Sequence, residues 1–283
     1  SSSLNTRLAL DGGYDEFRRL TQAFNTMMDR IERMVEAQRR FVTDAAHEIQ
    51  TPLTALKGNL EVAFRKNRRA SEYRETLIAN LGAVERLMNL CRSLIALTRL
   101  AGPNARLPQE AVNVHLVLEE LVEDMVVLAH DRHIELSLEA HPTPPITANR
   151  EQLQRLFINL IDNAIRHTPQ EGEVRMQLMM ENSQVVVTVS DSGEGIGPDH
   201  LPHIFERFYR VDTARSRERG GTGLGLAIVK EIVEAHEAEI RVESELGKGS
   251  TFTIRFPIPS EIIADSHTAP DRPFQGTSSS SHT

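Results

Sequence analysis

Apolar residues recur every three or four positions through most of residues 20–63. Alternating steps of four and three make a seven-residue repeat, which places one apolar seam along a helix. The step from Met34 to Val42 is eight residues, a stutter that shifts the phase between two coiled segments. The pattern predicts helix from about Asp15 to about Arg69. The seam residues are Leu20, Phe24, Met27, Ile31 and Met34, then Val42, Ala46, Ile49, Leu53, Leu56, Leu60 and Ala63.

A second helix is predicted over residues 71–100, and it carries two adjacent apolar stripes. Two stripes need more partners than one antiparallel neighbour supplies. A dimer in which two hairpins form a four-helix bundle would cover both. The first stripe consists of Leu77, Leu81, Val84, Met88, Cys91, Ile95 and Thr98, and the second of Ala83, Leu87, Leu90, Leu94 and Leu97.

The pattern changes after residues 101–108, where Gly102, Pro103 and Pro108 end the helix and mark a domain boundary. Helical and strand-like segments then alternate. Asn149 and Gln152 have the spacing of a capping box at the start of a helix at Arg150. The segments include runs of strands with segregated helices, which predict an α+β sandwich with one helical layer. The expected helices are 115–131, one from 150, and 223–236, and the expected strands are 134–139, 173–180, 184–190, 240–245 and 251–256, with a turn at 142–145.

Composition narrows the class of protein. The 283 residues suffice for two or three domains, and the net charge of −8 argues against a nucleic-acid partner, since such proteins are usually basic. The single cysteine, Cys91, excludes an intrachain disulfide and suits a reducing compartment. No apolar run approaches the ~18 residues of a membrane span. The chain lacks an initial Met and a signal peptide, so we expect a fragment of a longer protein.

The helix predicted at residues 41–64 has two unusual features. His47 lies beside the seam, so its ring should point to the flank and into solvent, with Glu48 next to it. Pro52 lacks an N–H and crowds the carbonyl of Glu48, so the helix should bend or loosen there. A lone histidine on such a helix is usually a plain surface residue, and a proline is usually a tolerated kink. Together the features are also consistent with a reactive histidine.

Four polar residues share one face of the helix that starts at Arg150. They are Asn159, Asn163, Arg166 and His167, while Leu153, Phe157, Leu160 and Ala164 lie on another face. Amide oxygens can bind Mg²⁺, and a guanidinium can bind phosphate oxygens. Taken alone, this face is more simply explained as a solvated one.

Glycine clusters follow two of the predicted elements. Asp191 ends an apolar strand and is followed by Gly193, Gly195 and Gly197; a carboxylate there can accept a hydrogen bond from an exocyclic amine, and glycines allow close approach to a flat ring. A second cluster precedes a helix, where free N–H groups and the helix dipole can bind an anion. Its spacing differs from the dinucleotide fingerprint. This cluster consists of Gly220, Gly221, Gly223 and Gly225, and Thr251 lies in a third motif, GKGSTF.

The order of these motifs resembles one family. HEIQTPLT resembles the H-box of bacterial sensor histidine kinases, and the later motifs resemble their N, G1, F, G2 and G3 boxes. The resemblance runs from about Asp15 to Pro257. It implies a dimeric helical hairpin followed by an α/β sandwich ATP-binding domain. Residues 15–34 resemble the second helix of a HAMP linker, although the first helix of that linker is missing.

The resemblance implies a role for each matched residue. His47 would accept phosphate, Glu48 would hold the proton of the other ring nitrogen, and Thr51 would align water for dephosphorylation of a partner. Asn163 and Asn159 would bind Mg²⁺. The residues expected to bind ATP are Asn159, Asn163, Arg166, His167, Asp191, Gly193, Gly195, Ile196, Gly197, Arg210, Gly221, Thr222, Gly223, Leu224, Gly225, Leu226 and Thr251. In this assignment Asp191 reads the adenine amine, Arg210 approaches the γ-phosphate, and residues 211–219 form a mobile lid.

Three positions depart from the usual family pattern. Arg166–His167 replaces Lys-Tyr after the N-box, which offers the adenine a smaller stacking surface. Gln50 replaces an Arg in the H-box, and this change bears on partner contact. Glu237 replaces a Gly after His236, which indicates a local change in a turn.

The expected function is ATP-dependent phosphorylation of His47, then transfer to an aspartate of a response regulator, with regulator phosphatase activity. The expected partners are a second copy and a receiver domain, with no nucleic acid, and a membrane only through upstream segments. Two alternatives remain: an ATPase clamp, disfavoured because Asn159 stands where such proteins carry Glu, and a scaffold without transfer. The expected divisions are 1–14 linker or tag remnant, 15–36 partial HAMP, 37–101 dimerisation and phosphotransfer, 102–110 linker, 111–259 ATP binding and 260–283 disordered tail.

Overall fold

The computed structural model describes residues 15–65, 69–100, 108–211 and 221–258. The chain divides into two compact units, residues 1–92 and 93–283, and each is described by itself. The predicted linker at 1–14, the tail at 260–283 and all but the first residue of the predicted lid lie outside the described residues. No helix within the described ranges combines the length and apolar character that a membrane span requires.

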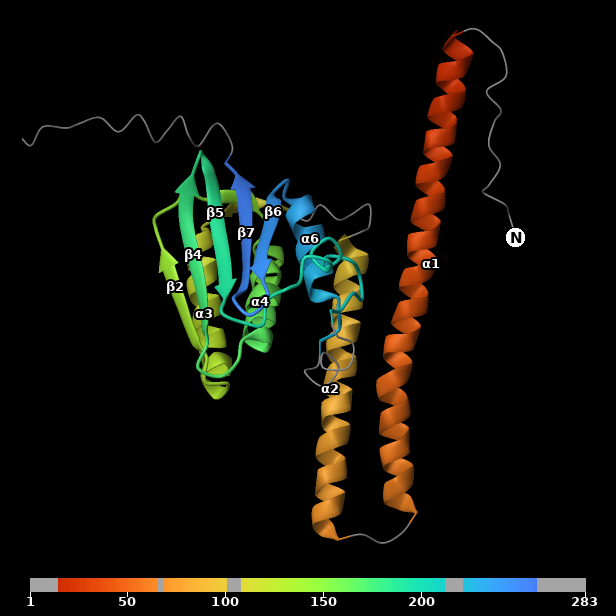
Figure 1. The fold of residues 1–283 in the computed structure, drawn as a ribbon, viewed down its shortest axis with the longest axis vertical. Helices are drawn as coiled ribbons and strands as arrows, with labels where there is room; N and C mark the ends of the chain where they lie inside the picture. Colours follow the sequence, from red (N-terminus) through yellow and green to blue (C-terminus); the bar gives the residue numbers. More distant parts are fainter. Residues whose placement is uncertain (1–14, 66–68, 101–107, 212–220, 259–283) are drawn as a thin grey trace, which may run out of the picture. The chain divides into compact units, whose positions relative to one another are not determined.

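The two long helices are α1 (Asp15–Phe64) and α2 (Ala70–Leu100), which form an antiparallel hairpin (Figure 1). The boundary between the two units falls within α2, after Arg92. The helix α1 continues through Pro52 and ends at Phe64, earlier than the predicted end near Arg69. Arg69 instead belongs to the start of α2, because its backbone N–H donates to Glu72 Oε2 at 2.8 Å. This is the bond of a capping box in which the side chain at the third helical position accepts from the N-cap N–H, and it stabilises the first turn of α2.

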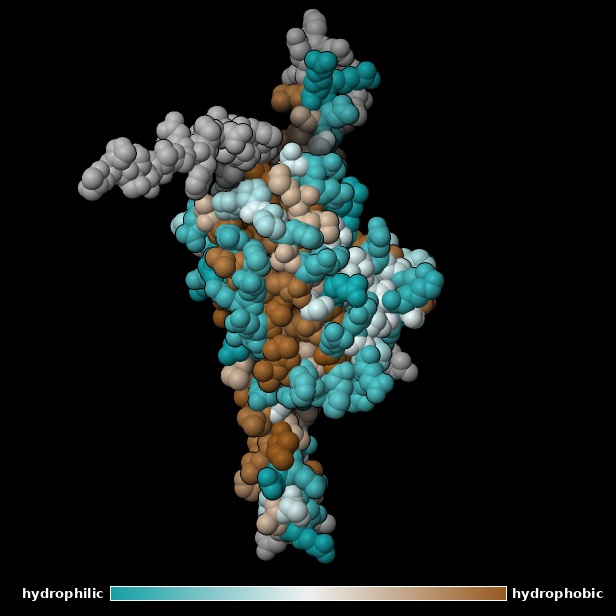
Figure 2. All heavy atoms as spheres, turned by 90° about the vertical axis from the view of Figure 1, so that its left-hand side faces the viewer, coloured by the Kyte–Doolittle hydropathy of each residue, from teal (hydrophilic) through white to brown (hydrophobic). Residues whose placement is uncertain are grey.

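Contacts within the chain separate the two stripes of α2. Ala83, Leu90 and Leu97 of the second stripe are buried. Leu77 and Leu81 of the first stripe remain 65% and 60% exposed. The seam of α1 is also open in places, and apolar side chains reach the surface of the hairpin at the lower end of Figure 2. The single chain therefore leaves an apolar surface on both helices.

The second unit is an α+β sandwich, as predicted. Its sheet has five strands in the order β2-β4-β5-β7-β6, with β2 and β4 parallel and the other pairs antiparallel. Three helices cover one face of this sheet (Figure 1). The strands are β2 (Glu135–Ala140), β4 (Glu173–Glu181), β5 (Gln184–Asp191), β6 (Glu239–Glu245) and β7 (Gly249–Pro257), and the helices are α3 (Val114–Asp131), α4 (Arg150–His167) and α6 (Gly225–Ala235).

The core lies between the sheet and the helices. The predicted apolar face of α4 is buried, and the ring of Phe157 meets that of Phe256 on β7 edge-on, with centroids 6.4 Å apart. Alternate residues of β4 and β7 point into the same layer, as the period of a strand requires. The packing of α4 therefore fixes which of its faces remains available for binding.

A second, two-stranded sheet was not predicted. It pairs β1 (Glu110–Val112) antiparallel with β3 (Ile146–Ala148). Each strand has three residues, too few for a period of two to be visible in the sequence. The pairing brings the entry to α3 beside the entry to α4.

The start of α4 confirms one half of the predicted capping box. Asn149 Oδ1 accepts from Gln152 N at 3.0 Å. The backbone N–H of Asn149, which a full capping box would give to Gln152, instead donates to His236 Nε2 at 3.1 Å. The other ring nitrogen of His236 donates to Ile232 O at 2.8 Å, so the ring is neutral with its proton on Nδ1. Burial of this ring lowers the pKa of His236.

Glu237 keeps the turn that a glycine usually makes at this position. Its φ of 52° lies in the left-handed region, and its N–H donates to Glu234 O at 3.1 Å. Glu237, which replaces the usual glycine, therefore adopts a backbone conformation that favours glycine. A residue with a side chain in this conformation lowers the stability of the fold by about 1 kcal/mol.

The lowered pKa of His236 predicts acid sensitivity. The unfolded chain binds the proton more readily, so this contribution to stability is full above about pH 6.5 and is lost as the pH falls below it. The free energy of unfolding can be measured with urea at several pH values from 8 down to 5. As the pH falls, we expect it to decrease less steeply in His236→Gln than in the wild type. The two slopes should differ by at most about 1.4 kcal/mol per pH unit. Ser137→Ala, at an exposed residue without a titratable side chain, should keep the wild-type slope. Equal slopes in wild type and His236→Gln would contradict this assignment.

Candidate functional site

The polar face of α4 forms one wall of the candidate site. The helix α4 is continuous over Asn159, Asn163, Arg166 and His167, so their spacing puts them on one face, as predicted, and all four are half-buried. Asn159 Nδ2 donates to Arg155 O at 2.7 Å, which fixes the orientation of its amide. Its Oδ1 lies against the first residue of α6, because a Cβ added to Gly225 would be 3.0 Å from that oxygen. The amide oxygen of Asn159 therefore faces the start of α6.

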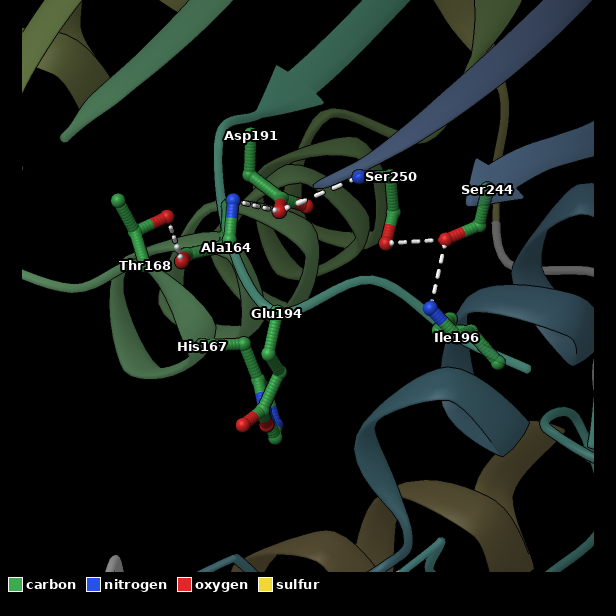
Figure 3. A network of polar contacts seen from close by, with 9 residues as sticks. Ala164, His167, Thr168, Asp191, Glu194, Ile196, Ser244 and Ser250 are labelled. Atoms are coloured by element: carbon green, nitrogen blue, oxygen red, sulfur yellow. Dashed lines mark hydrogen bonds and ion pairs between the residues drawn. The ribbon is translucent and has the colours of Figure 1, made fainter. Parts of the chain in front are cut away.

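Two of these four residues already have carboxylate partners. Arg166 Nε pairs with Asp162 Oδ2 at 2.7 Å, one turn earlier on α4. His167 Nδ1 lies 2.7 Å from Glu194 Oε1 in the loop after β5 (Figure 3). The backbone repeats this link, because Glu194 N donates to His167 O at 3.2 Å. Two hydrogen bonds thus link the C-terminal end of α4 to the glycine loop that follows Asp191.

Asp191 ends β5 and is held by main-chain donors. Its Oδ1 accepts from Gly193 N at 2.9 Å and from Ser250 N at 3.3 Å (Figure 3). Burial raises the pKa of Asp191, and these two hydrogen bonds act in the opposite direction. Ser190 Oγ lies 3.1 Å from Thr251 Oγ1, and these two residues are strand partners. Asp191 follows Ser190 on β5 and is paired with Ser250, so its carboxylate points to the opposite face of the sheet from the Thr251 hydroxyl. The structure therefore places Ser250, and not the predicted Thr251, beside Asp191.

The loop after Asp191 lies close to the end of β6. Gly195 has a φ of 69°, and a Cβ there would lie 2.1 Å from Glu245 O, so only glycine fits without a shift. Gly197 is different, because a Cβ there would meet nothing closer than His200 Cδ2 at 3.6 Å. The motif predicted the same role for both glycines, but their surroundings in the structure differ.

The second glycine cluster leads into α6. The helix begins at Gly225, two residues after the predicted start at Gly223. Leu224 occupies the N-cap position and offers no side-chain hydrogen bond, so the N–H groups of the first turn keep their capacity to bind an anion. Gly221 and Thr222 precede this turn and Leu226 lies within it, and all three are half-buried.

The F-box segment is tied to this helix start. Phe208 N donates to Gly223 O at 2.8 Å, and Gly223, with a φ of 67°, allows the two backbones to approach. Arg207 pairs with Glu231 on α6 at 2.7 Å. Arg210 is half-buried at the end of this segment. The described segments before and after the predicted lid are therefore linked to each other, by the bond between Phe208 and Gly223.

The H-box lies in the helical unit. His47 is exposed on α1 as predicted, and Glu48 beside it is half-buried. Thr51 Oγ1 donates to His47 O at 3.1 Å, which places both residues on one side of the helix. An imidazole with open access to solvent can act as a nucleophile through its neutral nitrogen.

The polar groups of the second unit fit a nucleotide with a bound metal ion. Asp191 offers an acceptor, the start of α6 offers N–H donors, and Asn159 and Asn163 offer amide oxygens, which suit Mg²⁺. Within the described ranges, no cluster of three or more histidine, cysteine or acidic side chains is placed to hold a metal. A metal in this site would therefore depend on amide and phosphate oxygens.

Sequence reasoning missed three residues that shape the site. Glu194 fastens the glycine loop to α4, while Ser244 and Ser250 connect it to β6 and β7 (Figure 3). Serines are common in loops and on strand surfaces, so nothing in their spacing marked them. The adjacent motif GKGSTF was the available signal for Ser250.

Two known domain families match the chain. The His Kinase A (phospho-acceptor) domain matches residues 37–103. The Histidine kinase-, DNA gyrase B-, and HSP90-like ATPase family matches residues 148–260. The fold and the site thus define a phospho-acceptor hairpin joined to an ATPase domain of this type. The chain belongs to the sensor histidine kinases of two-component systems.

Curated relatives agree with this assignment. The signal transduction histidine-protein kinase ArlS of Staphylococcus epidermidis is 35% identical over 253 residues, covering 89% of this chain and 55% of ArlS. The phosphate regulon sensor protein PhoR of Pseudomonas aeruginosa is 34% identical over 245 residues, covering 85% of this chain and 54% of PhoR. The chain spans about half the length of these relatives.

Solved structures share the architecture. Histidine kinase AdeS of Acinetobacter baumannii has a TM-score of 0.60 at 25% identity, covering 76% of this chain and 98% of AdeS. Full-length ShkA in complex with AMPPNP has a TM-score of 0.58 at 27% identity, covering 77% of this chain and 45% of ShkA. ThkA in complex with the response regulator TrrA has a TM-score of 0.66, covering 84% of this chain and 67% of that one, and at 20% identity it shows the fold alone.

The contrast between Gly195 and Gly197 gives a test of the site. We expect Gly195→Ala to weaken binding of AMPPNP about tenfold or more, since strain and displacement of the loop cost at least ~1.4 kcal/mol. Gly197→Ala should change the affinity less than about threefold, because its Cβ meets only ordinary contacts. Isothermal titration of both variants with AMPPNP and Mg²⁺ measures the difference. Equal losses in the two variants would show that the close approach to Glu245 does not control binding.

Proposed function

We propose that this chain is the kinase portion of a sensor that phosphorylates His47 from ATP and passes the phosphate to an aspartate of a response regulator. The observation that carries the proposal is an exposed His47 in a phospho-acceptor hairpin, joined to a unit whose donor set fits a nucleotide. The AMPPNP complex of ShkA supports ATP as the nucleotide.

The chemistry begins at the imidazole of His47. One ring nitrogen attacks the γ-phosphorus of ATP, an N–P bond forms, the bond to the β-phosphate oxygen breaks, and ADP leaves. Glu48 is adjacent in sequence and holds the proton of the other ring nitrogen, which keeps the attacking lone pair free. Mg²⁺ bound by Asn163 with Asn159 would neutralise charge on the phosphates. The resulting His–phosphate is labile and suits a relay.

The nucleotide-binding roles follow from the contacts of the site. Asp191 accepts a hydrogen bond from the adenine amine, with Ser250 beside it, and the start of α6 binds phosphate oxygens. Arg166 is held by Asp162 and would have to leave this ion pair, or share it, to reach phosphate. His167 presents its ring to the adenine while Glu194 holds one of its nitrogens. Arg210 approaches the γ-phosphate from the base of the lid.

The proposed assembly is a homodimer. The uncovered stripe of α2 and the open seam of α1 would pack against a second copy to form a four-helix bundle. We further propose the division into residues 37–101 for dimerisation and phosphotransfer and 111–259 for ATP binding. Residues 15–36 would continue a HAMP linker, and upstream segments of a longer protein would place this part on the cytoplasmic side of a membrane.

Replacement of His47 tests the proposed acceptor. We expect His47→Gln to incorporate no phosphate from γ-labelled ATP while its affinity for AMPPNP stays within about threefold of wild type, since His47 lies outside the nucleotide-binding unit. Label on the wild type should survive alkali and be lost in acid. His115→Gln, a histidine on α3, is the matched control and should label normally. Label retained by His47→Gln would refute the assignment of His47 as the acceptor. If the wild type releases ADP but takes up no label, an ATPase clamp is favoured. If it shows no label and no ADP release, a scaffold without phosphate transfer is favoured.

Replacement of Thr51 tests the proposed phosphatase role. We expect Thr51→Ala to keep autophosphorylation. Its rate of dephosphorylating a phosphorylated receiver domain should be at least about tenfold lower than that of the wild type, which is the usual effect of removing a group that positions a reactant. Thr54→Ala is the matched control, because Thr54 makes the same type of bond, to Gln50 O at 2.8 Å, on the same helix. Equal dephosphorylation by the two variants would exclude a special role for Thr51.

A further inference from the structure

The glycine loop after Asp191 is supported by the end of the β6–β7 hairpin at successive residues. Glu194 O accepts from Gly247 N at 2.9 Å, and Gly195 lies against the carbonyl of Glu245. Both contacts use main-chain atoms, so they need no particular side chain beyond the glycine itself. These contacts hold the loop against the hairpin, but they do not fix the orientation of the peptide group between Gly195 and Ile196.

The next contact depends on a side chain. Ile196 N donates to Ser244 Oγ at 2.7 Å, and Ser244 is half-buried on β6 (Figure 3). The same hydroxyl donates to Gly249 O at 2.9 Å, so its proton is used there and its lone pair is directed to Ile196. Because a trans peptide sets C=O opposite N–H, this bond turns the Gly195 carbonyl away from β6. Ser244 thus fixes the orientation of the peptide between Gly195 and Ile196.

The hydroxyl is also linked to the carboxylate of the site. Ser244 Oγ lies 3.0 Å from Ser250 Oγ, and Ser250 N donates to Asp191 Oδ1. Ser244 and Ser250 face each other across β6 and β7 in the strand register. The position of the glycine loop and that of Asp191 therefore depend on the same pair of strand residues.

We propose that Ser244 is a positioning residue for the nucleotide, acting through the backbone of Ile196. The inference rests on the proposed function of the site, because it assigns the loop after Asp191 to nucleotide binding. Removing the hydroxyl leaves a half-buried N–H without its acceptor and lets the loop move from the place where the nucleotide meets it. Ser244 touches no reacting atom, so the loss falls on binding and not on the chemical step.

The test compares Ser244→Ala with Ser244→Thr, which keeps the hydroxyl and suits a strand. We expect Ser244→Ala to raise the Kd for AMPPNP and the KM for ATP about tenfold, equal to ~1.4 kcal/mol or one hydrogen bond. The kcat for labelling of His47 should stay within about twofold. Amide hydrogen exchange at Ile196 should accelerate in Ser244→Ala. Ser244→Thr should restore all three values, and Ser137→Ala, on exposed β2 surface, should match wild type.

The outcomes are distinguishable. Unchanged Kd, KM and Ile196 exchange in Ser244→Ala would overturn the inference. So would a loss shared equally by Ser244→Thr, or a fall in kcat as large as the rise in KM together with a lower Tm, since these indicate general damage to the fold. If wild type binds AMPPNP and Ser244→Ala binds it weakly, but wild type never labels His47, the proposed kinase function fails while the role of Ser244 stands.

Discussion

The carboxylate of Asp191 is the point on which the candidate site depends. It ends a strand whose inward side chains are buried, and burial alone would favour its neutral form, because it raises the pKa. The N–H groups of Gly193 and Ser250 oppose that effect by donating to one carboxylate oxygen. These bonds also bring the following loop and β7 to the same atom. One electrostatic requirement thus determines where two separate segments lie.

The other wall of the site is positioned by the core. Residues such as Phe157 and Leu160 are fully buried, which fixes the rotation of α4 about its axis. Asn159 and Asn163 must then lie on the side that remains partly open, next to the start of α6. A change that let α4 rotate would move the amide oxygens and the contact of His167 with Glu194 together. Packing energy, which is far larger than any one of these polar contacts, is what holds the site in shape.

Much of the fold and part of the site followed from the sequence alone. Period and motif order were sufficient for the two long helices, the main sheet and the polar face of α4. The sequence did not reveal which donor would meet the backbone of Asn149, because His236 is far away along the chain and a local capping box offered a simpler partner. Gly195 and Gly197 were equivalent in the sequence, and only the position of Glu245 distinguished them. Ser244 was missed because its role arises from a hydrogen bond between segments that have no sequence pattern in common.

The apolar stripes of α2 carry a constraint that joins assembly to chemistry. The uncovered stripe contains no charged residue from Leu77 to Thr98, so its exposure in the single chain is not that of an ordinary solvated face. Packing the proposed second copy against it, and against the seam of α1, sets the rotation of α1 in the bundle. His47 follows the seam residue Ala46 by one position, about 100° around the helix. The same contacts that would bury the seam would therefore turn His47 toward the flank of the bundle, where its ring stays open to solvent.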